Sequence, residues 1–407
     1  MRFVMQLWQR HLSNIPCTLR TWEIHKFCRA KEISKELRLT TTRRPPYVAS
    51  SEQVIVQTEA ASLNPIDALI MSGYGSAAFR WARAFKNGFF PSALSQSDFP
   101  LIPGRDFSGC VSVAGPDAVK AGFVEGQSVL GAVWPFNRGC LTDYVVCPRH
   151  FLAVRPESLN PVAAASLSYA GLTAWSALRN GGGFCPKKVE PGFGPRVLVT
   201  GVTGAVGSIA SQLAIMGGAS HLTVTCPSRA DPKEIKRLLS AHQVISAPNT
   251  PPASESYDLI IDCVRPTYLK ASEGASGLCH RVAGEEQFPL LRYLSSHSRA
   301  RYVSVNPPLF RYMAELGPLL GIGASALSLL MPNLRNISRA NCGQIRWAFF
   351  EPSGSRLQLM ANWAAEGRLH VPIDSIFPFS EVPVAFKKMQ AGGNNGKIAI
   401  SWSPSAS

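Results

Sequence analysis

The residues best suited to chemistry are three glycines, Gly201, Gly204 and Gly207, spaced three apart in the stretch RVLVTGVTGAVG. The β-branched run 196–200 before them predicts a short buried strand, and apolar residues at helical spacing over 206–214 predict a helix. Glycines between a strand and a helix allow a tight turn and a close approach of the backbone to a pyrophosphate. The free N–H groups at the start of the helix would hold the phosphates. The pattern predicts a dinucleotide site, and the alternative is a glycine-rich turn that binds no ligand. The residues expected to contact the nucleotide here are Thr203, Gly204, Ala205, Val206 and Gly207.

The next predicted strand, HLTVT at 221–225, ends without the acid that commonly holds the ribose hydroxyls of NAD. Cys226 follows the strand, and the first acid is Asp231, with Ser228 and Arg229 between them. A hydroxyl and a guanidinium suit a 2′-phosphate, which a carboxylate would repel. We therefore predict NADPH as the cofactor, and the alternative is that Arg229 is an ordinary solvated residue.

The elements around this turn alternate between strand and helix. Strands are predicted at 197–200, 221–225, 257–262 and 301–306, which indicates a doubly wound parallel sheet. Before residue 165 the chain has many short strands with turn signals, which are typical of a partly closed β domain. With 407 residues the chain is long enough for two such domains.

Composition limits the class of protein. The formal net charge is +15, and the ten cysteines form no Cys-x-x-Cys pair, which argues for reduced thiols instead of a disulfide framework or zinc ribbon.

Residues 1–22 contain Arg2, Arg10 and Arg20 but no acid, as in a mitochondrial transit peptide, and a disordered basic tail is the alternative. The most apolar stretch, 316–334, is too interrupted to span a membrane and is interpreted as a buried helix or loop. Contact of this stretch with an apolar ligand or a membrane surface is the alternative.

One long loop mixes aromatic and basic side chains. The stretch YGSAAFRWARAFKNGFFPSALSQSDFP interleaves aromatic residues with Arg80, Arg83 and Lys86. Such a loop could pack on the body of the domain, form a lid over an apolar substrate, or bind nucleic acid. Packing and a lid are the favoured interpretations, and we expect no nucleic-acid partner.

Several stretches resemble one family. AASLNPIDALIMSGYG, FPLIPGRDFSG, LSYAGLTAWSAL, VTGVTGAVG and RYVSV resemble medium-chain dehydrogenases/reductases of the zinc-free quinone oxidoreductase branch. The resemblance implies an α/β fold in which a Rossmann doubly wound parallel-sheet domain interrupts a GroES-like, partly closed β-barrel catalytic domain. The stretches RWAFF and FPFSEVPVAF resemble mitochondrial NADPH oxidoreductases tied to ubiquinone biosynthesis. The expected divisions are a leader at 1–22, the first catalytic part at 23–165, the NADPH-binding domain at 166–339 and the second catalytic part at 340–407.

The resemblance also allows a test for zinc. Zinc members have a Cys where this chain has Asn64 or its neighbours, and a His where it has Arg105 between Gly104 and Asp106. An arginine, which is always charged, cannot ligate Zn²⁺, and no soft ligand replaces the Cys. The four clustered cysteines of a structural zinc lobe are absent too. We therefore expect no metal.

The chain departs from the family at the nucleotide site. Ala205 replaces a usual Gly, Ser246 and Ala247 replace an Asp-Tyr pair, and 262–265 reads Asp-Cys-Val-Arg in place of a DNVG turn. These changes could weaken nucleotide binding, or Arg265 could add a phosphate contact. The resemblance implies further cofactor contacts at Val264, Val305, Asn306, Gly396 and Lys397.

Without a metal, the chemistry left is hydride transfer to an activated acceptor. A quinone or enone accepts hydride through its own conjugated carbonyl, but it needs a donor to the developing enolate oxygen. Tyr74 is the candidate proton donor, and Asn64 could orient the carbonyl or the nicotinamide ribose. Arg105 is expected to pair with Asp106 or Asp67, and the alternative for Tyr74 is a packing role.

The leading hypothesis is an NADPH-dependent, zinc-independent reductase of a small quinone or enone in mitochondria, with a homodimer and contact with a membrane surface as further partner hypotheses. The alternatives are an NADPH-binding scaffold with little turnover and an enoyl thioester reductase, which would need room for an acyl chain.

Overall fold

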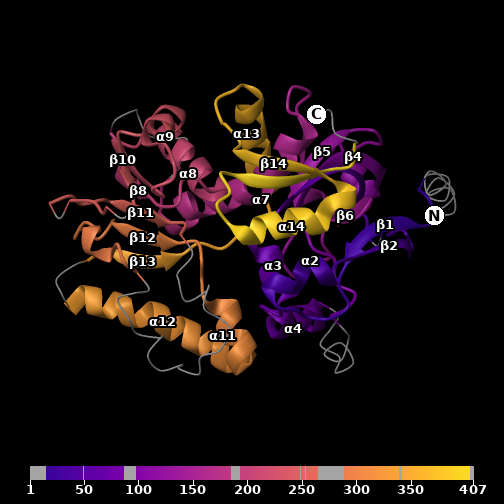
Figure 1. Cartoon of the computed structure of the whole chain (residues 1–407), viewed down its shortest axis with the longest axis horizontal. Coiled ribbons are helices and arrows are strands. Elements are labelled where there is room, and N and C mark those ends of the chain that lie inside the picture. Colours follow the sequence, from indigo (N-terminus) through magenta and orange to yellow (C-terminus); the bar gives the residue numbers. More distant parts are fainter. Residues whose placement is uncertain are drawn as a thin grey trace. The chain divides into compact units, whose positions relative to one another are not determined.

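A computed structural model describes residues 15–48, 50–86, 98–184, 193–247, 249–252, 254–264, 288–338 and 342–403. The chain forms two compact units. Unit 1 comprises Met1–Leu172 and Glu351–Ser407, and unit 2 comprises Thr173–Phe350. Figure 1 shows unit 1 in indigo to magenta and again in yellow, because the chain returns to it after unit 2.

Unit 1 is built on a mainly antiparallel sheet in the order β14-β15-β3-β4-β5-β7, with β6 paired to β3. The one parallel pair in it is β14 with β15. Its strands are β3 (Gln53–Leu63), β4 (Asp106–Ala114), β5 (Ser128–Ala132), β6 (Tyr144–Pro148), β7 (Leu152–Val154), β14 (Ile373–Pro378) and β15 (Lys397–Ser401). The long strand β3 is central because its apolar run VIV and its small residues AAS pack on both sides of the sheet, where they are buried.

Short helices cover the sheet of unit 1. Their bounds are η2 (Ala30–Glu32), α2 (Ile33–Glu36), α3 (Pro65–Met71), α4 (Ser76–Lys86), α6 (Pro116–Lys120), η3 (Arg149–Phe151), α13 (Gly354–Ala365), η8 (Phe379–Glu381) and α14 (Val382–Ala391). Pro65 begins α3 because a proline at the first helical position lacks only an N–H that would have no partner there. The stretch predicted as a basic and aromatic loop begins as helix α4, and its residues 87–97 lie outside the described residues.

A separate two-stranded sheet corrects the predicted end of the leader. Strand β1 (Leu19–Glu23) pairs with β2 (Arg38–Arg43), and the ring N–H of Trp22 donates to the carbonyl of Phe379 at 2.7 Å. Leu19 and Trp22 are buried, so cleavage after residue 22 would remove part of the core. A removable leader would have to end before Ile15, which is also buried, and 1–14 lies outside the described residues.

Unit 2 contains a six-stranded sheet in the order β10-β9-β8-β11-β12-β13, in which every pair is parallel. Its strands and first helices are β8 (Arg196–Val199), α8 (Ala205–Met216), β9 (His221–Cys226), α9 (Pro232–Leu239), β10 (Gln243–Ser246), β11 (Leu259–Asp262), β12 (Arg301–Ser304) and β13 (Gln344–Trp347). The strand order reverses between β8 and β11, which is the place where such sheets bind ligands.

The domain boundaries differ from the expected 165/166 and 339/340. Helix α7 (Pro161–Ser176) runs without interruption past residue 166, and the division falls after Leu172. Strand β13 extends the parallel sheet beside β12, so residues up to Phe350 belong to unit 2. The sequence pattern also missed β10, because it is a short edge strand with one buried residue.

The stretch 316–334 corrects another expectation. It lies mainly in α12 (Pro318–Ser338), which follows α11 (Leu309–Leu316), and its large apolar side chains are exposed instead of buried. The other helical segments that the structure describes in unit 2 are η4 (Ala177–Gly181) and η7 (Leu291–Tyr293). Within the described ranges, every helix is too short or too polar to cross a bilayer.

Candidate nucleotide and catalytic sites

The glycine turn of unit 2 has the form that a phosphate cradle requires. Gly201 has a φ of +66°, a backbone conformation that favours glycine. A Cβ at Gly207 would lie 2.6 Å from the carbonyl oxygen of Gly201, so only glycine lets α8 approach the end of β8 this closely. Gly204 is the N-cap of α8, and no side chain caps the helix. The first N–H groups of α8 therefore lack an internal acceptor and suit an anion.

The five residues predicted around this turn differ in exposure. Thr203, Gly204 and Val206 are partly exposed, whereas Ala205 and Gly207 are buried. Ala205 begins α8, so its methyl group is accommodated within the first turn of the helix. The substitution of the usual glycine thus leaves the cradle intact, and the turn fits a nucleotide diphosphate.

The ends of β9 and β10 lie side by side at the carboxyl edge of the sheet. The Cys226 thiol lies 3.8 Å from the Ser246 hydroxyl, and the N–H of Ala247 donates to the carbonyl of Cys226 at 2.9 Å. Ser228 and Arg229 are exposed just beyond, and Arg229 has no ion-pair partner among the described residues. An edge with a guanidinium and without a carboxylate fits an adenosine 2′-phosphate better than a free ribose diol.

The sequence reasoning missed a buried carboxylate next to the glycine turn. Asp262, at the end of β11, accepts hydrogen bonds from the Tyr302 hydroxyl at 2.6 Å and the Thr200 hydroxyl at 2.8 Å. Burial raises the pKa of Asp262, and these two hydrogen bonds oppose that rise. The Thr200 oxygen also accepts from the N–H of Cys263 at 2.9 Å. The network fixes the ends of β8, β11 and β12 relative to one another, and the acid that ends the run DLIID was its sequence signal.

The loops after β11 and β12 meet at this same edge. The Asn306 amide donates to the carbonyl of Val264 at 3.2 Å, and the N–H of Val305 donates to the carbonyl of Asp262 at 3.2 Å. Val264 is exposed. The structure thus brings together Val264, Val305 and Asn306 with the glycine turn, while Arg265 lies outside the described residues.

Unit 1 holds a buried cluster around Asn64. The Lys397 ammonium lies 2.6 Å from the Asn64 side-chain oxygen and 3.0 Å from Asp106, while the Asn64 amide nitrogen donates to Asp106 at 3.1 Å. Asp106 also accepts from the hydroxyl and the N–H of Ser62. All four residues are buried. Both ends of the Asn64 amide are therefore engaged, and Lys397 and Asp106 fix its orientation.

Arg105 has a structural position beside this cluster. Its guanidinium lies 3.2 Å from Asp67 and donates at 2.9 Å to each of the carbonyls of Ile102, Pro135 and Asn137. Burial raises the pKa of Asp67, and the nearby Arg105 charge opposes that rise. The predicted pairing of Arg105 with Asp67 is confirmed, and four of the five N–H groups of its guanidinium donate to Asp67 or to backbone carbonyls.

Tyr74 lines a cavity of about 250 Å³ in unit 1. Aromatic rings form much of its wall, contributed by Phe27, Tyr74, Phe79, Phe99 and Phe136. The edge of Arg105 also reaches this cavity. The wall also carries the charged side chains of Arg43, Asp98 and Arg138, so a flat molecule with both an aromatic ring and polar groups fits it, and Tyr74 is the residue of the predicted pair that lines it.

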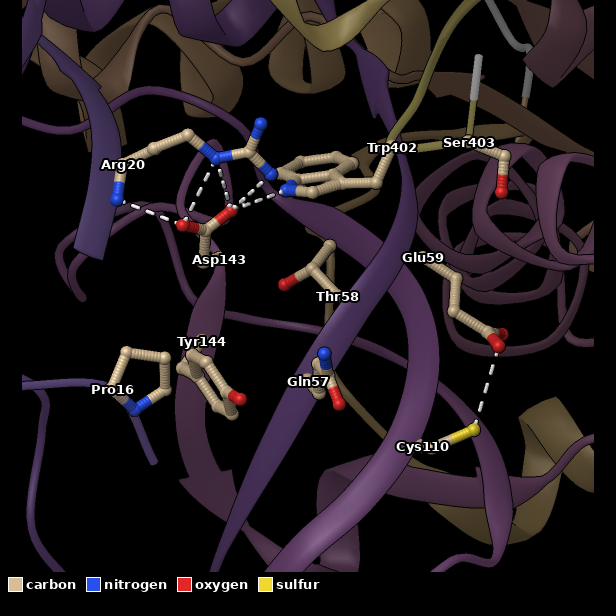
Figure 2. Close-up of a pocket in the computed structure, with 10 residues that line it drawn as sticks. All are labelled: Pro16, Arg20, Gln57, Thr58, Glu59, Cys110, Asp143, Tyr144, Trp402 and Ser403. Carbon is tan, nitrogen blue, oxygen red and sulfur yellow. Dashed lines mark hydrogen bonds and ion pairs between the residues drawn. The ribbon is translucent and has the colours of Figure 1, made fainter. Parts of the chain in front are cut away.

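A larger hollow of about 440 Å³ also lies in unit 1, and Figure 2 shows its lining. Asp143 accepts from the backbone and guanidinium of Arg20, at 2.8 Å and 3.0 Å, and from the Trp402 ring N–H at 2.9 Å. On the opposite side, the Cys110 thiol donates to Glu59, and burial raises its pKa. The charged groups of this hollow pair with one another, and Asp143 joins Arg20 of β1 to Trp402, which follows β15. We therefore assign the hollow a structural role.

Comparisons with known proteins place this arrangement in a family. Residues 50–157 match the family described as alcohol dehydrogenase GroES-like domain, and 239–400 match the family described as zinc-binding dehydrogenase. The mouse protein named NAD(P)H oxidoreductase RTN4IP1, mitochondrial, is 33% identical over 379 residues, which cover 93% of this chain and 88% of the relative. The chain belongs to the medium-chain dehydrogenase/reductase superfamily. The predicted fold class and resemblance are thereby confirmed.

Other relatives of this medium-chain dehydrogenase/reductase carry related names. The human NAD(P)H oxidoreductase RTN4IP1, mitochondrial, is 32% identical over 93% of this chain and 88% of its own length. An Arabidopsis thaliana protein named chloroplast envelope quinone oxidoreductase homolog is 27% identical, covering 88% of this chain and 92% of the relative. The structure of a quinone oxidoreductase from Coxiella burnetii shares the fold with a TM-score of 0.68 at 24% identity, covering 95% of this chain and 100% of that one.

The family description mentions zinc, and this chain's residues can be compared with that requirement. Among the residues that the structure describes, no group of three or more His, Cys, Asp or Glu side chains is placed to hold a metal ion. At the position of the zinc-binding His, the Arg105 side chain is committed to Asp67 and to backbone carbonyls. This donor set does not fit zinc.

Proposed function

We propose that this protein is an NADPH-dependent, zinc-independent oxidoreductase that transfers a hydride to a quinone or a related enone. The observation that carries the proposal is the glycine turn at the reversal point of the parallel sheet, with the uncapped N-terminus of α8 beside it. The β9 end, with Arg229 and without a carboxylate, supports NADPH over NADH. The relatives named NAD(P)H oxidoreductase support the same cofactor.

Within unit 2, the cradle residues bind the diphosphate through main-chain N–H groups, and Arg229 with Ser228 neutralises the adenosine 2′-phosphate. The Asp262 network holds the strand ends that carry these loops. When bound, NADPH supplies the hydride. The chain's own residues then have only to orient the acceptor, exclude water and supply a proton.

Within unit 1, Tyr74 donates the proton to the acceptor oxygen, because its hydroxyl belongs to a cavity lined by aromatic rings. Lys397 and Asp106 fix the rotamer of Asn64. The side-chain nitrogen of Asn64 carries a second N–H, and we propose that this N–H orients a carbonyl or hydroxyl group. Lys397 therefore acts on the reaction as a positioning residue, through Asn64. Arg105 shapes the cavity wall by holding the loop at Pro135 and Asn137.

The proposed location is mitochondrial, with a role linked to ubiquinone biosynthesis. The mouse and human relatives are named mitochondrial, and the Arabidopsis relative is named a quinone oxidoreductase homolog. The segment 1–14 contains no acidic residue, which is compatible with an import signal.

The test begins with the nucleotide. Titration of the full chain with NADPH and NADH should show tighter binding of NADPH, and Arg229→Ala should weaken NADPH binding about tenfold while leaving NADH unchanged. Arg237→Ala, another exposed arginine of unit 2, is the matched control. Equal affinity of the wild-type chain for both nucleotides would contradict the assignment of Arg229.

Turnover is tested separately with a panel of quinones and enals. Tyr74→Phe should lower kcat about tenfold or more with little change in KM if Tyr74 supplies the proton. The departure at Ser246–Ala247 favours a second candidate function, an NADPH-binding scaffold with little turnover. NADPH uptake without oxidation by any acceptor of the panel would support the scaffold against the reductase.

A further inference from the structure

Helix α12 has its polarity reversed relative to an ordinary surface helix. Six large apolar side chains fall within an arc of about 100° when 3.6 residues are allotted to each turn. They are between 46% and 76% exposed, and they are Leu319, Leu320, Leu327, Leu330, Leu334 and Ile337. A helix of 21 residues that covers a soluble domain would normally turn this stripe inward.

The opposite face of α12 is small and polar, and it is the face that packs on unit 2. Gly321, Ser325, Ser328 and Asn336 are buried there. The Asn336 amide donates to the carbonyl of Gly343 at 2.6 Å, and the Ser328 hydroxyl donates to the carbonyl of Ser325 at 2.8 Å. The Ser328 bond lies within α12, whereas the Asn336 bond joins the helix to Gly343 and fixes this face inward. The outward stripe is a built feature of the fold and not the result of a rotated helix.

Asn333 confirms this orientation from a second position. Its side chain accepts from the N–H of Ile345 at 2.8 Å and donates to the carbonyl of the same residue at 3.0 Å. Ile345 lies in β13, the edge strand of the parallel sheet, and Figure 1 shows α12 in orange alongside it. The side-chain amide thus pairs with the backbone of the sheet edge, and Asn333 lies about a quarter turn around the helix from the centre of the leucine stripe.

The charge of the segment that carries the stripe indicates which kind of surface covers it. Residues 288–350, which include α11, α12, β12 and β13, contain seven arginines, one acid (Glu315) and no lysine. The whole chain carries a formal net charge of +15. A second copy of the same face would bring like charges together, whereas an anionic lipid surface would attract them.

We propose that the leucine stripe of α12 docks unit 2 onto an anionic membrane surface, with the helix lying in the plane of the interface. The apolar side chains enter the boundary between headgroups and acyl chains, and exposed arginines of this segment, among them Arg335 on α12, contact lipid phosphates. The helix does not span the bilayer, in agreement with the absence of a spanning helix from the described residues. This inference is independent of the proposed reaction.

The experiment measures co-sedimentation of the full chain with vesicles. Vesicles of phosphatidylcholine with phosphatidylglycerol should bind the wild-type chain at least about tenfold more tightly than pure phosphatidylcholine, and salt should weaken the binding. The triple variant Leu327→Gln, Leu330→Gln, Leu334→Gln should lose about tenfold or more of this binding. Leu238→Gln, at an exposed apolar position of α9, is the matched control and should bind as the wild type does.

Two further measurements keep the proposal falsifiable. The NADPH affinity and the thermal midpoint of the triple Leu→Gln variant should match those of the wild type, because exposed leucines support no packing. A triple Leu→Ile variant at the same three positions should retain vesicle binding. Unchanged vesicle binding by a folded triple variant would overturn the proposal, since another segment would then carry it. A wild-type dimer that the triple variant dissociates, without vesicle binding by either, would overturn it in favour of a second copy.

Discussion

Replacing Arg105 by lysine tests how unit 1 is held together. The Arg105 side chain is 1% exposed, pairs with Asp67 and donates at 2.9 Å to the carbonyls of Ile102, Pro135 and Asn137. Lysine keeps the charge beside Asp67, but its single ammonium cannot replace the planar fork that reaches all three carbonyls. With about 1 kcal/mol lost per hydrogen bond, Arg105→Lys should lower the free energy of unfolding by about 3 kcal/mol.

Arg105→Met goes further, because it leaves the Asp67 carboxylate without its counterion. The expected loss at neutral pH is about 3–5 kcal/mol. Burial already raises the pKa of Asp67 and Arg105 opposes that rise, so the variant should have a still higher pKa at Asp67. When the pKa of a carboxyl group is higher in the folded than in the unfolded protein, the free energy of unfolding decreases as the pH rises through the pKa of the folded state. The deficit of Arg105→Met should therefore be largest at alkaline pH and should shrink as the pH falls.

The assay is urea denaturation of the full chain at about pH 8 and about pH 5.5. Arg368→Lys, in an exposed pair with Glu366, is the matched control and should change the free energy of unfolding by less than about 0.5 kcal/mol. An unchanged midpoint for Arg105→Lys, or a deficit of Arg105→Met that grows toward acid pH, would refute the reasoning.

Two other substitutions test unit 2. Gly207→Ala places a Cβ 2.6 Å from a backbone oxygen that cannot move aside, so thermal unfolding should show a loss of about 2 kcal/mol and titration a weaker NADPH complex. Gly323→Ala, in the interior of α12 where nothing lies within 4 Å, should raise stability by about 0.5–1 kcal/mol and leave NADPH binding unchanged, and equal behaviour of the two variants would contradict the close-approach argument. Tyr302→Phe removes the 2.6 Å hydrogen bond to Asp262 and should cost about 2 kcal/mol at neutral pH. Because burial raises the pKa of Asp262, that cost should decrease in unfolding experiments at lower pH, and a constant cost would count against an ionised carboxylate there.

The comparison between sequence and structure is clearest at the nucleotide site. The glycine spacing predicted the turn because a tight turn followed by a close helix leaves few other residue types at positions 201 and 207. The absence of an acid after β9 could likewise be read from the sequence, because it depends only on which residue type follows the second strand of the unit. Strands β10 and β13 were missed because short edge strands carry little periodicity of their own.

Long-range partners were accessible only in part. The pairing of Arg105 with Asp67 followed from their types and from the resemblance, whereas the bridge from Lys397 to Asn64 joins residues 333 positions apart. A buried lysine in a closing strand has no local signal that names its partner. The same holds for Tyr302 and Asp262, which neighbouring parallel strands bring together.

The sequence by itself determined the family, the alternation of elements and the presence of a phosphate-binding turn, because these depend on local spacing and residue type. Tertiary structure alone decided that Asn64 has both amide atoms engaged, that residues 19–22 belong to the core and that α12 turns its leucines outward. The apolar spacing of α12 was compatible with a buried helix. Only the hydrogen bonds of Asn333 and Asn336 to the backbone at the sheet edge fix which face of the helix is inward.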